Sequence, residues 1–160
     1  MKKAFTLIEL LLTITLTSVM AVLFVSYYNF NTLTKLNIET QLNSQINLIS
    51  ATIFQCKNLS NQFPVIDANT PLHVESALNT LECNTSTPYE LDGGNGGFIP
   101  KELNGFSTWE ALQNADEFYI CTTATTLNSL QDEVLKDLNT TYSTTQYEYS
   151  NGKMKFYLSR

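Results

Sequence analysis

The chain has 160 residues, enough for one small domain or for one domain with an appended segment. Hydrophobic residues make up 43% of it and charged residues 15%, which supports a packed core and argues against disorder. The net charge is −6, and acidic surfaces repel phosphate backbones, so we expect no nucleic-acid partner.

The cysteines and the histidine give no metal-binding pattern. Cys56, Cys83 and Cys121 share no C-x-x-C spacing, and the chain has a single histidine, His73. We therefore predict no metal and no cofactor. Outside the cytoplasm, three cysteines favour one disulfide and one remaining thiol.

The N-terminal segment predicts a membrane helix. No charged residue occurs from Leu10 to Thr34, and about 20 helical residues cross a bilayer core. Lys2 and Lys3 precede this segment, which predicts a cytoplasmic N-terminus and a periplasmic remainder by the positive-inside rule.

Three simpler interpretations compete with a specialised membrane helix. A secretory signal peptide usually has a shorter apolar run without an acid, whereas this run is long and has Glu9 near its start. A plain anchor has no use for Glu9, because a carboxylate costs about 2.5–3.5 kcal/mol at the bilayer centre and less toward its edge. A buried core helix would require a small protein to enclose an entirely apolar cylinder. Glu9 therefore implies a partner group.

The segment from Lys2 to Leu10 (KKAFTLIEL) resembles the cleavage motif of type IV prepilins and type II secretion pseudopilins. The resemblance implies that a membrane prepilin peptidase cuts between Ala4 and Phe5 and methylates the new amine of Phe5. It also implies that Glu9 pairs with the Phe5 amine of a neighbouring subunit. The chain differs from the family in having Ala4 in place of the usual glycine. It also has Ser26 where many major pilins have proline, which favours a minor subunit or a pseudopilin.

The resemblance implies a structural subunit, a minor pilin or pseudopilin, of a filament machine for secretion, adhesion or uptake. Its expected partners are prepilin peptidase, other pilin-like subunits, the inner-membrane assembly platform and the lipid bilayer. The expected location is the bacterial inner membrane, as a single-pass protein. The alternative is a tethered or secreted periplasmic binding protein that uses the N-terminus only as an anchor or signal. No catalytic motif occurs, so we predict no enzyme.

A helical stripe extends the membrane helix into the soluble half. No Gly or Pro interrupts Phe5–Gln62, which predicts one long helix. The fold class expected is α+β and pilin-like, with this helix packed on a small antiparallel β-sheet head. The expected parts are a leader (1–4), a membrane segment (5–30), an amphipathic continuation (31–62) and a globular head (63–160). The stripe repeats every three or four residues and comprises Ile38, Leu42, Ile46, Ile49, Ile53 and Cys56.

Residues 61–97 are interpreted as a loop, with Pro64 ending the helical region and 72–81 forming a short strand or helix. A Cys56–Cys83 disulfide would tie this loop to the helix and stabilise the fold by about 3–4 kcal/mol. The alternative is two separately buried thiols. The glycine-rich segment after Asp92 favours a tight turn over a calcium loop, because Asp92 and Asn95 offer only one carboxylate.

The C-terminal third contains the clearest strand signals. We predict a strand at 117–122, which places Cys121 in or near the core, and a hairpin of 144–150 and 153–158 around Asn151-Gly152. Between them a short amphipathic helix is expected, with Asn128 and Gln131 as its capping pair. The apolar positions of that helix are Leu127, Leu130, Val134 and Leu138.

Overall fold

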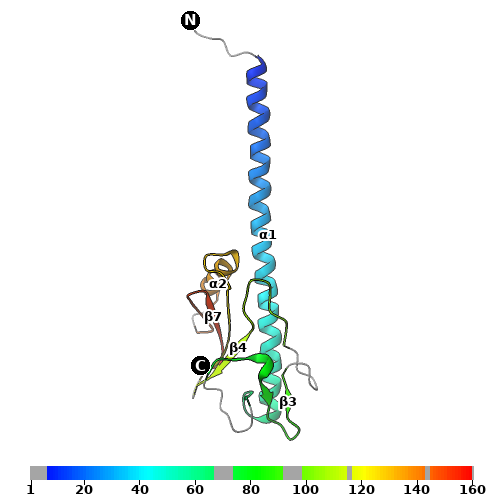
Figure 1. The fold of residues 1–160 in the computed structure, drawn as a ribbon, viewed down its shortest axis with the longest axis vertical. Coiled ribbons are helices and arrows are strands. Elements are labelled where there is room, and N and C mark those ends of the chain that lie inside the picture. Colours follow the sequence, from blue (N-terminus) through cyan, green and yellow to red (C-terminus); the bar gives the residue numbers. More distant parts are fainter. Residues whose placement is uncertain (1–6, 67–73, 92–98, 115–116, 143–144, 160) are drawn as a thin grey trace. The chain divides into compact units, whose positions relative to one another are not determined.

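The structure is a computed structural model that describes residues 7–66, 74–91, 99–114, 117–142 and 145–159. It has the predicted α+β class, with a long N-terminal helix followed by antiparallel strands (Figure 1). The chain divides into two compact units, Met1–Asn37 and Ile38–Arg160, which are described separately below.

Helix α1 (Leu7–Ser60) includes residues of both units. It is one long helix, as the absence of Gly and Pro from this part of the sequence predicts. It ends two residues before the expected Gln62. Asn61 adopts a left-handed conformation with φ 59°, which stops the helix at its C-terminal end. The Ser60 hydroxyl donates a hydrogen bond to the Cys56 carbonyl at 2.8 Å and so satisfies one of the last carbonyls.

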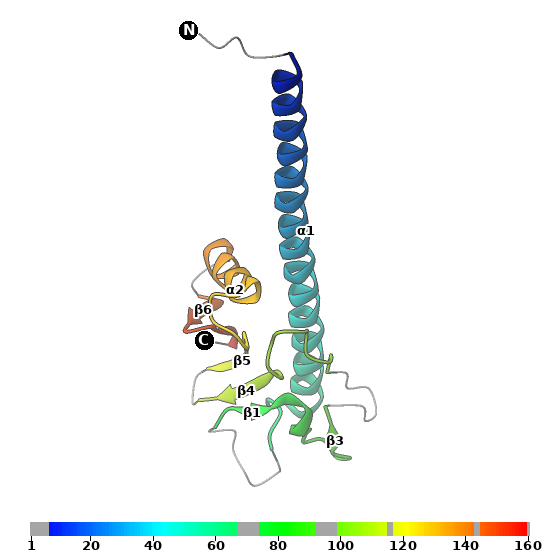
Figure 2. The same cartoon turned by 45° about the horizontal axis from the view of Figure 1, so that its top comes forward.

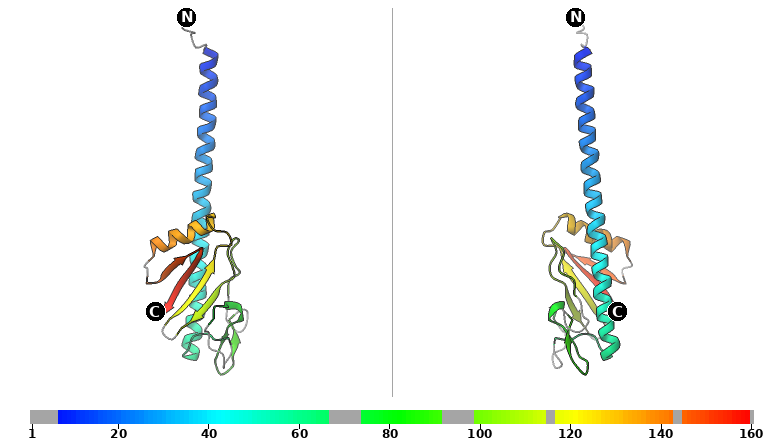
Figure 3. Two further views of the ribbon diagram at one scale, coloured as in Figure 1. Left: turned by 60° about the vertical axis from the view of Figure 1, so that its left-hand side comes forward. Right: turned by 90° about the vertical axis from the view of Figure 1, so that its right-hand side faces the viewer.

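The second unit contains a five-stranded antiparallel sheet in the order β1-β4-β5-β7-β6 and a separate two-stranded hairpin, β2-β3 (Figure 2). Figure 3 shows the larger sheet beside the part of α1 that belongs to this unit. The strands are β1 (Ser76–Ala77), β2 (Glu82–Cys83), β3 (Tyr89–Glu90), β4 (Glu110–Gln113), β5 (Phe118–Thr123), β6 (Tyr147–Ser150) and β7 (Lys153–Ser159).

The predicted C-terminal hairpin is confirmed, with slightly different strand bounds. β6 begins at Tyr147 and pairs with β7, so that Ser150 lies opposite Lys153. Asn151 and Gly152 connect the strands with φ 51° and 76°, the positive values that a two-residue hairpin turn requires.

The region predicted as one loop contains more structure than expected. Besides β1, β2 and β3, it holds a 3₁₀ helix, η1 (Leu78–Thr80), so the predicted strand or helix near 72–81 is partly confirmed. Strand β4 was not predicted from the sequence. Its four residues (EALQ) show no apolar alternation, and pairing with β5 holds them in the sheet.

The capping prediction for α2 (Leu130–Thr141) is wrong by one residue. The N-cap is Ser129, whose hydroxyl accepts a hydrogen bond from the Asp132 amide, and the Asp132 carboxylate accepts one from the Asn128 amide at 2.8 Å. Gln131 instead donates to the Asn104 carbonyl. Asn128 has a left-handed φ of 57°, which places it in the turn before the cap.

The core lies between the second half of α1 and one face of the sheet. The stripe residues from Leu42 to Cys56 are at most 2% exposed, which confirms the predicted packing of this part of the helix. They belong to one cluster with sheet residues such as Phe118, Ile120 and Met154. Neighbouring strand residues Tyr119, Cys121 and Tyr157 form a second cluster, because alternate side chains point to opposite faces of a sheet.

Candidate functional site

The described part of the first unit contains one helical segment long and apolar enough to cross a membrane, Ile8–Val25. None of it is buried against other described residues. Its large apolar side chains are between 54% exposed, at Leu10 and Met20, and 75% exposed, at Ile8. Soluble proteins rarely leave so large an apolar surface in water, and exposure on all sides suits lipid.

The hydroxyl groups within this segment hydrogen-bond to carbonyls of their own helix. Thr13 donates to the Leu10 carbonyl at 2.8 Å, and Ser18 donates to the Ile14 carbonyl at 2.7 Å. Such bonds remove the cost of placing unpaired donors in hydrocarbon. The hydroxyls are therefore compatible with a membrane span.

Glu9 lies in the first turn of α1 and is exposed. It is the only charged residue between Leu7 and Thr34. The expected cleavage residues, Ala4 and Phe5, lie outside the described residues. The structure therefore gives the position of the carboxylate on the helix but does not describe the cleavage site.

Cys56 and Cys83 are placed as a disulfide pair, with their Cα atoms 5.5 Å apart and a sequence separation of 27. This separation is typical of bridged cysteines. Both residues are fully buried, and they join the end of α1 to β2. The geometry is compatible with the predicted bridge.

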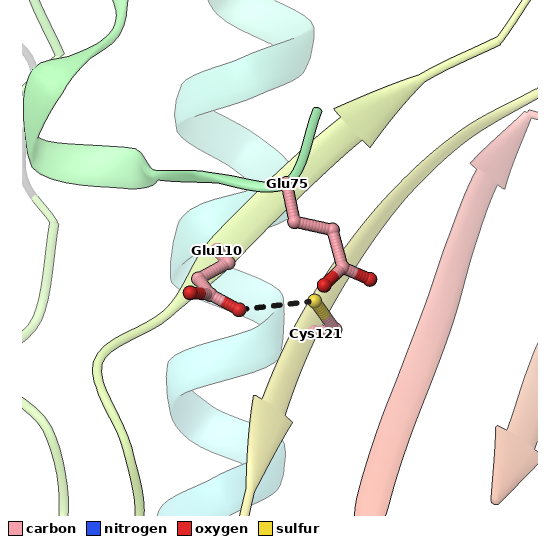
Figure 4. Close-up of side chains that lie close together, drawn as sticks. All are labelled: Glu75, Glu110 and Cys121. Atoms are coloured by element: carbon pink, nitrogen blue, oxygen red, sulfur yellow. Dashed lines mark hydrogen bonds between the residues drawn. The ribbon is translucent and has the colours of Figure 1, made fainter. Parts of the chain in front are cut away.

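The outer face of the sheet brings together three groups that the sequence analysis did not connect. Glu75 precedes β1, Glu110 lies in β4 and Cys121 in β5, and their ligand atoms are within 4.8 Å of one another (Figure 4). The Cys121 thiol lies 4.0 Å from a Glu110 carboxylate oxygen. Two carboxylates and a sulfur are a set that can bind a metal ion.

Lys153 from β7 already supplies a positive charge to this cluster. Its ammonium donates to the Glu75 carboxylate and lies 3.8 Å from that of Glu110. Burial raises the pKa of the Cys121 thiol to about 12, although the Lys153 charge acts in the opposite direction. Because the thiol is protonated at neutral pH, it is a poor nucleophile. We interpret the cluster as an ion-pair network that closes the outer sheet face.

Tyr119 belongs to the same network. Its hydroxyl donates to Glu75 at 3.1 Å, and the Lys155 ammonium lies 5.1 Å from the centre of its ring. Burial would raise the pKa of the Glu75 carboxyl, but the hydrogen bond and charge of Lys153 outweigh it and hold that pKa below its ordinary value. Glu75 therefore stays ionised and paired.

A buried carboxylate, Asp132, was also missed. It accepts hydrogen bonds from the Lys136 ammonium at 2.8 Å and from the Tyr149 hydroxyl, and thereby joins α2 to β6. The sequence did contain a signal, because Ser129 followed three residues later by Asp132 matches a capping pattern.

The remaining sequence-predicted residues, His73, Asp92 and Asn95, lie outside the described residues. Comparisons with protein-family models, with curated proteins and with solved structures find no match to this chain.

Proposed function

We propose that this chain is a structural subunit, a minor pilin or pseudopilin, of a type IV filament machine in a bacterial inner membrane. The observation that carries the proposal is Glu9, the one charged residue of the sequence between Leu7 and Thr34, which lies in the first turn of a span whose apolar side chains are exposed. The resemblance of Lys2–Leu10, a segment that includes Glu9, to prepilin cleavage sites also supports it.

The energetics of Glu9 favour a partner over a passive role. A carboxylate in the first turn of a helix gains about 0.3–1 kcal/mol from the helix dipole. The cost of placing a charge in the bilayer rises from the edge inward and reaches about 2.5–3.5 kcal/mol at the centre. The dipole gain is smaller than that cost at the centre. An amine from a neighbouring subunit would neutralise Glu9 and favour assembly.

The packing of the second unit supports a role for its part of α1 in transmitting force. Residues Ile38–Ser60 of α1 belong to this unit, and the core is built on them. Leu42, Ile49 and Ile53 are at most 1% exposed, so displacing the helix from the sheet would open the core. A force applied to this part of α1 would thus be passed to the rest of the second unit.

In the proposed mechanism, prepilin peptidase removes residues 1–4 and methylates the Phe5 amine. The processed subunit waits in the bilayer with its head in the periplasm. The assembly platform then extracts it, and its helix packs against the helices of neighbouring subunits. Glu9 forms its ion pair with a neighbour's Phe5 amine at this step.

The test compares Glu9→Ala with Glu39→Ala, which removes another carboxylate from the same helix outside the apolar span. Both variants are expressed in cells that hold the complete machine, and incorporation into filaments or secretion is measured. Glu9→Ala is expected to abolish incorporation while leaving membrane insertion intact, and Glu39→Ala is expected to assemble normally. Normal function of Glu9→Ala would favour the alternative, a tethered periplasmic binding protein.

A further inference from the structure

The chain contains three copies of the asparagine acceptor sequence Asn-x-Ser/Thr. They begin at Asn58 (Asn-Leu-Ser), Asn84 (Asn-Thr-Ser) and Asn139 (Asn-Thr-Thr). In exported proteins this sequence receives N-linked oligosaccharides, which are bulky and must lie on the surface. The structure distinguishes among the three positions.

Two of the three sequences are helical. Asn58–Ser60 lies at the end of α1, and Asn139–Thr141 lies at the end of α2. Residues i and i+2 of a helix do not share a face, so the asparagine and its hydroxyl partner cannot both approach an enzyme from one side. The hydroxyls are also engaged, because Ser60 donates to the Cys56 carbonyl and Thr141 to the Asp137 carbonyl.

Asn84 lies instead in the turn that joins β2 to β3. The Thr85 amide donates to the Cys83 carbonyl at 2.9 Å, a three-residue turn that has Asn84 at its centre. Asn84 is half-buried and Ser86 is exposed. Neither the Asn84 carboxamide nor the Ser86 hydroxyl has a hydrogen-bond partner among the described residues, so both groups are available to an enzyme.

The surroundings of Asn84 hold the acceptor segment in place and leave room beside it. Cys83 pairs with Tyr89 across the hairpin and with Cys56 in the disulfide position, so both sides of the turn are fixed. An open groove of about 460 Å³ adjoins the turn. It is lined by Leu59, Thr85, Ser86, Thr87 and Tyr89. The groove thus leaves open space beside Thr85 and Ser86 of the acceptor sequence.

Charge does not discriminate between the acceptor sequences in β2-β3 and in α2. Glu82 precedes Asn84 by two residues, and Asp137 precedes Asn139 by the same distance. A transferase that recognises a nearby carboxylate would find one at either site. The backbone conformation and the free hydroxyl at Ser86 therefore decide between them.

We propose that Asn84 is the acceptor of an N-linked oligosaccharide. In this reaction a bond forms between Nδ2 of Asn84 and the anomeric carbon of a polyprenyl-diphosphate-linked oligosaccharide. The bond between that carbon and the diphosphate oxygen breaks, the polyprenyl diphosphate leaves with the electron pair, and Nδ2 loses one proton to a base of the transferase. The proposal rests on the periplasmic location of the head proposed above, since the donor and transferase act there. The attached glycan would solvate the β2-β3 end of the head.

The experiment uses the full chain, produced in a bacterial host that makes a lipid-linked oligosaccharide and its periplasmic transferase. An established acceptor protein in the same cells shows that the transferase is active. Intact mass is measured for the wild type and for Asn84→Gln, with Asn58→Gln and Asn139→Gln as matched controls. The wild type and both controls are expected to carry one glycan mass that Asn84→Gln lacks.

Changes at Ser86 separate enzyme recognition from a structural effect. Ser86→Ala is expected to lose the glycan, and Ser86→Thr, which restores the hydroxyl, is expected to retain it. An unmodified wild type beside a modified acceptor protein would overturn the proposal, as would a glycan that persists in Asn84→Gln. The mass of the N-terminal peptide in the same samples reports prepilin processing separately, so failure of one proposal is distinguishable from failure of the other.

Discussion

The indole Nε1 of Trp109 donates a hydrogen bond to the side-chain oxygen of Gln45 at 2.8 Å. The side-chain nitrogen Nε2 of Gln45 in turn donates a hydrogen bond to the Lys101 carbonyl at 2.7 Å. The Gln45 side chain of α1 thus contacts both Trp109, the residue before β4, and Lys101 in the segment that leads to β4. Trp109 is only 4% exposed, so this contact lies at the edge of the core and fixes the rotation of the helix relative to the sheet.

Trp109→Phe is expected to destabilise the second unit. Phe keeps an aromatic ring but loses the donor, and an unmade hydrogen bond of this kind costs about 1–3 kcal/mol. Denaturant unfolding of the full chain in detergent measures the change. Gln55→Ala, an exposed change on the same helix, is the control and should lie near zero. Equal stabilities of the two variants would contradict the proposed role of the Trp109–Gln45 contact.

Loss of the Cys56–Cys83 pair is expected to cost more than any single hydrogen bond. A bridge between cysteines with a sequence separation of 27 contributes about 3–4 kcal/mol in the chain-entropy model. Cys83→Ser should lower the unfolding free energy by about this amount, and a reductant should have the same effect on the wild type. If reductant leaves the wild-type unfolding curve unchanged, the two cysteines are separate thiols.

Cys121 is expected to be inert in the folded protein. It is fully buried, and burial raises its pKa to about 12, so almost no thiolate forms at neutral pH. Alkylation without reductant should label no cysteine in the native chain and one after denaturation. Two or three labels in the denatured, unreduced chain would exclude the bridge, and rapid native labelling would contradict the burial of Cys121.

The Asp132 network is expected to make stability fall in acid. The hydrogen bond from Lys136, followed by that from Tyr149, lowers the pKa of Asp132 to about 2. A carboxyl with a lowered folded-state pKa contributes fully above its ordinary pKa of about 4, and that contribution is lost as the pH falls toward 2. Asp132→Asn should therefore flatten the pH dependence of the unfolding free energy between about pH 4 and about pH 2. It should also reduce stability at neutral pH by about 1.5–3 kcal/mol.

The control for Asp132 is Glu133→Gln, which removes an exposed carboxylate from the adjacent position of α2. This variant should keep the wild-type dependence on pH. If both variants flatten the curve equally, the effect reflects net charge and not the Asp132 network.

The sequence predicted those elements whose signals are local. The Asn151-Gly152 turn, the apolar run after Glu9 and the stripe from Ile38 to Cys56 each depend on spacing within one segment, and each was found in the structure. The end of α1 was predicted two residues too late. Asn61 takes a left-handed conformation that ends the helix, and the polar residues around it gave no sequence signal for this.

The outer-face cluster was not predictable in the same way. Glu75, Glu110, Cys121 and Lys153 come from four separate segments, and only the pairing of the strands brings them together. Glu110 lies opposite Cys121, and Cys121 lies opposite Lys155, in a register that no local pattern specifies. Strand β4 itself gave no strand signal in the sequence, so the place of Glu110 in the cluster could not be predicted.

The central claim is that this chain is processed and assembled as a pilin-like subunit. Its most direct test is the intact mass of the protein purified from membranes of cells that contain its own prepilin peptidase. The account predicts the loss of Met1 through Ala4 and the gain of one methyl group on Phe5. An uncut N-terminus, or a cut near Ala21 of the kind made by signal peptidase, would contradict it.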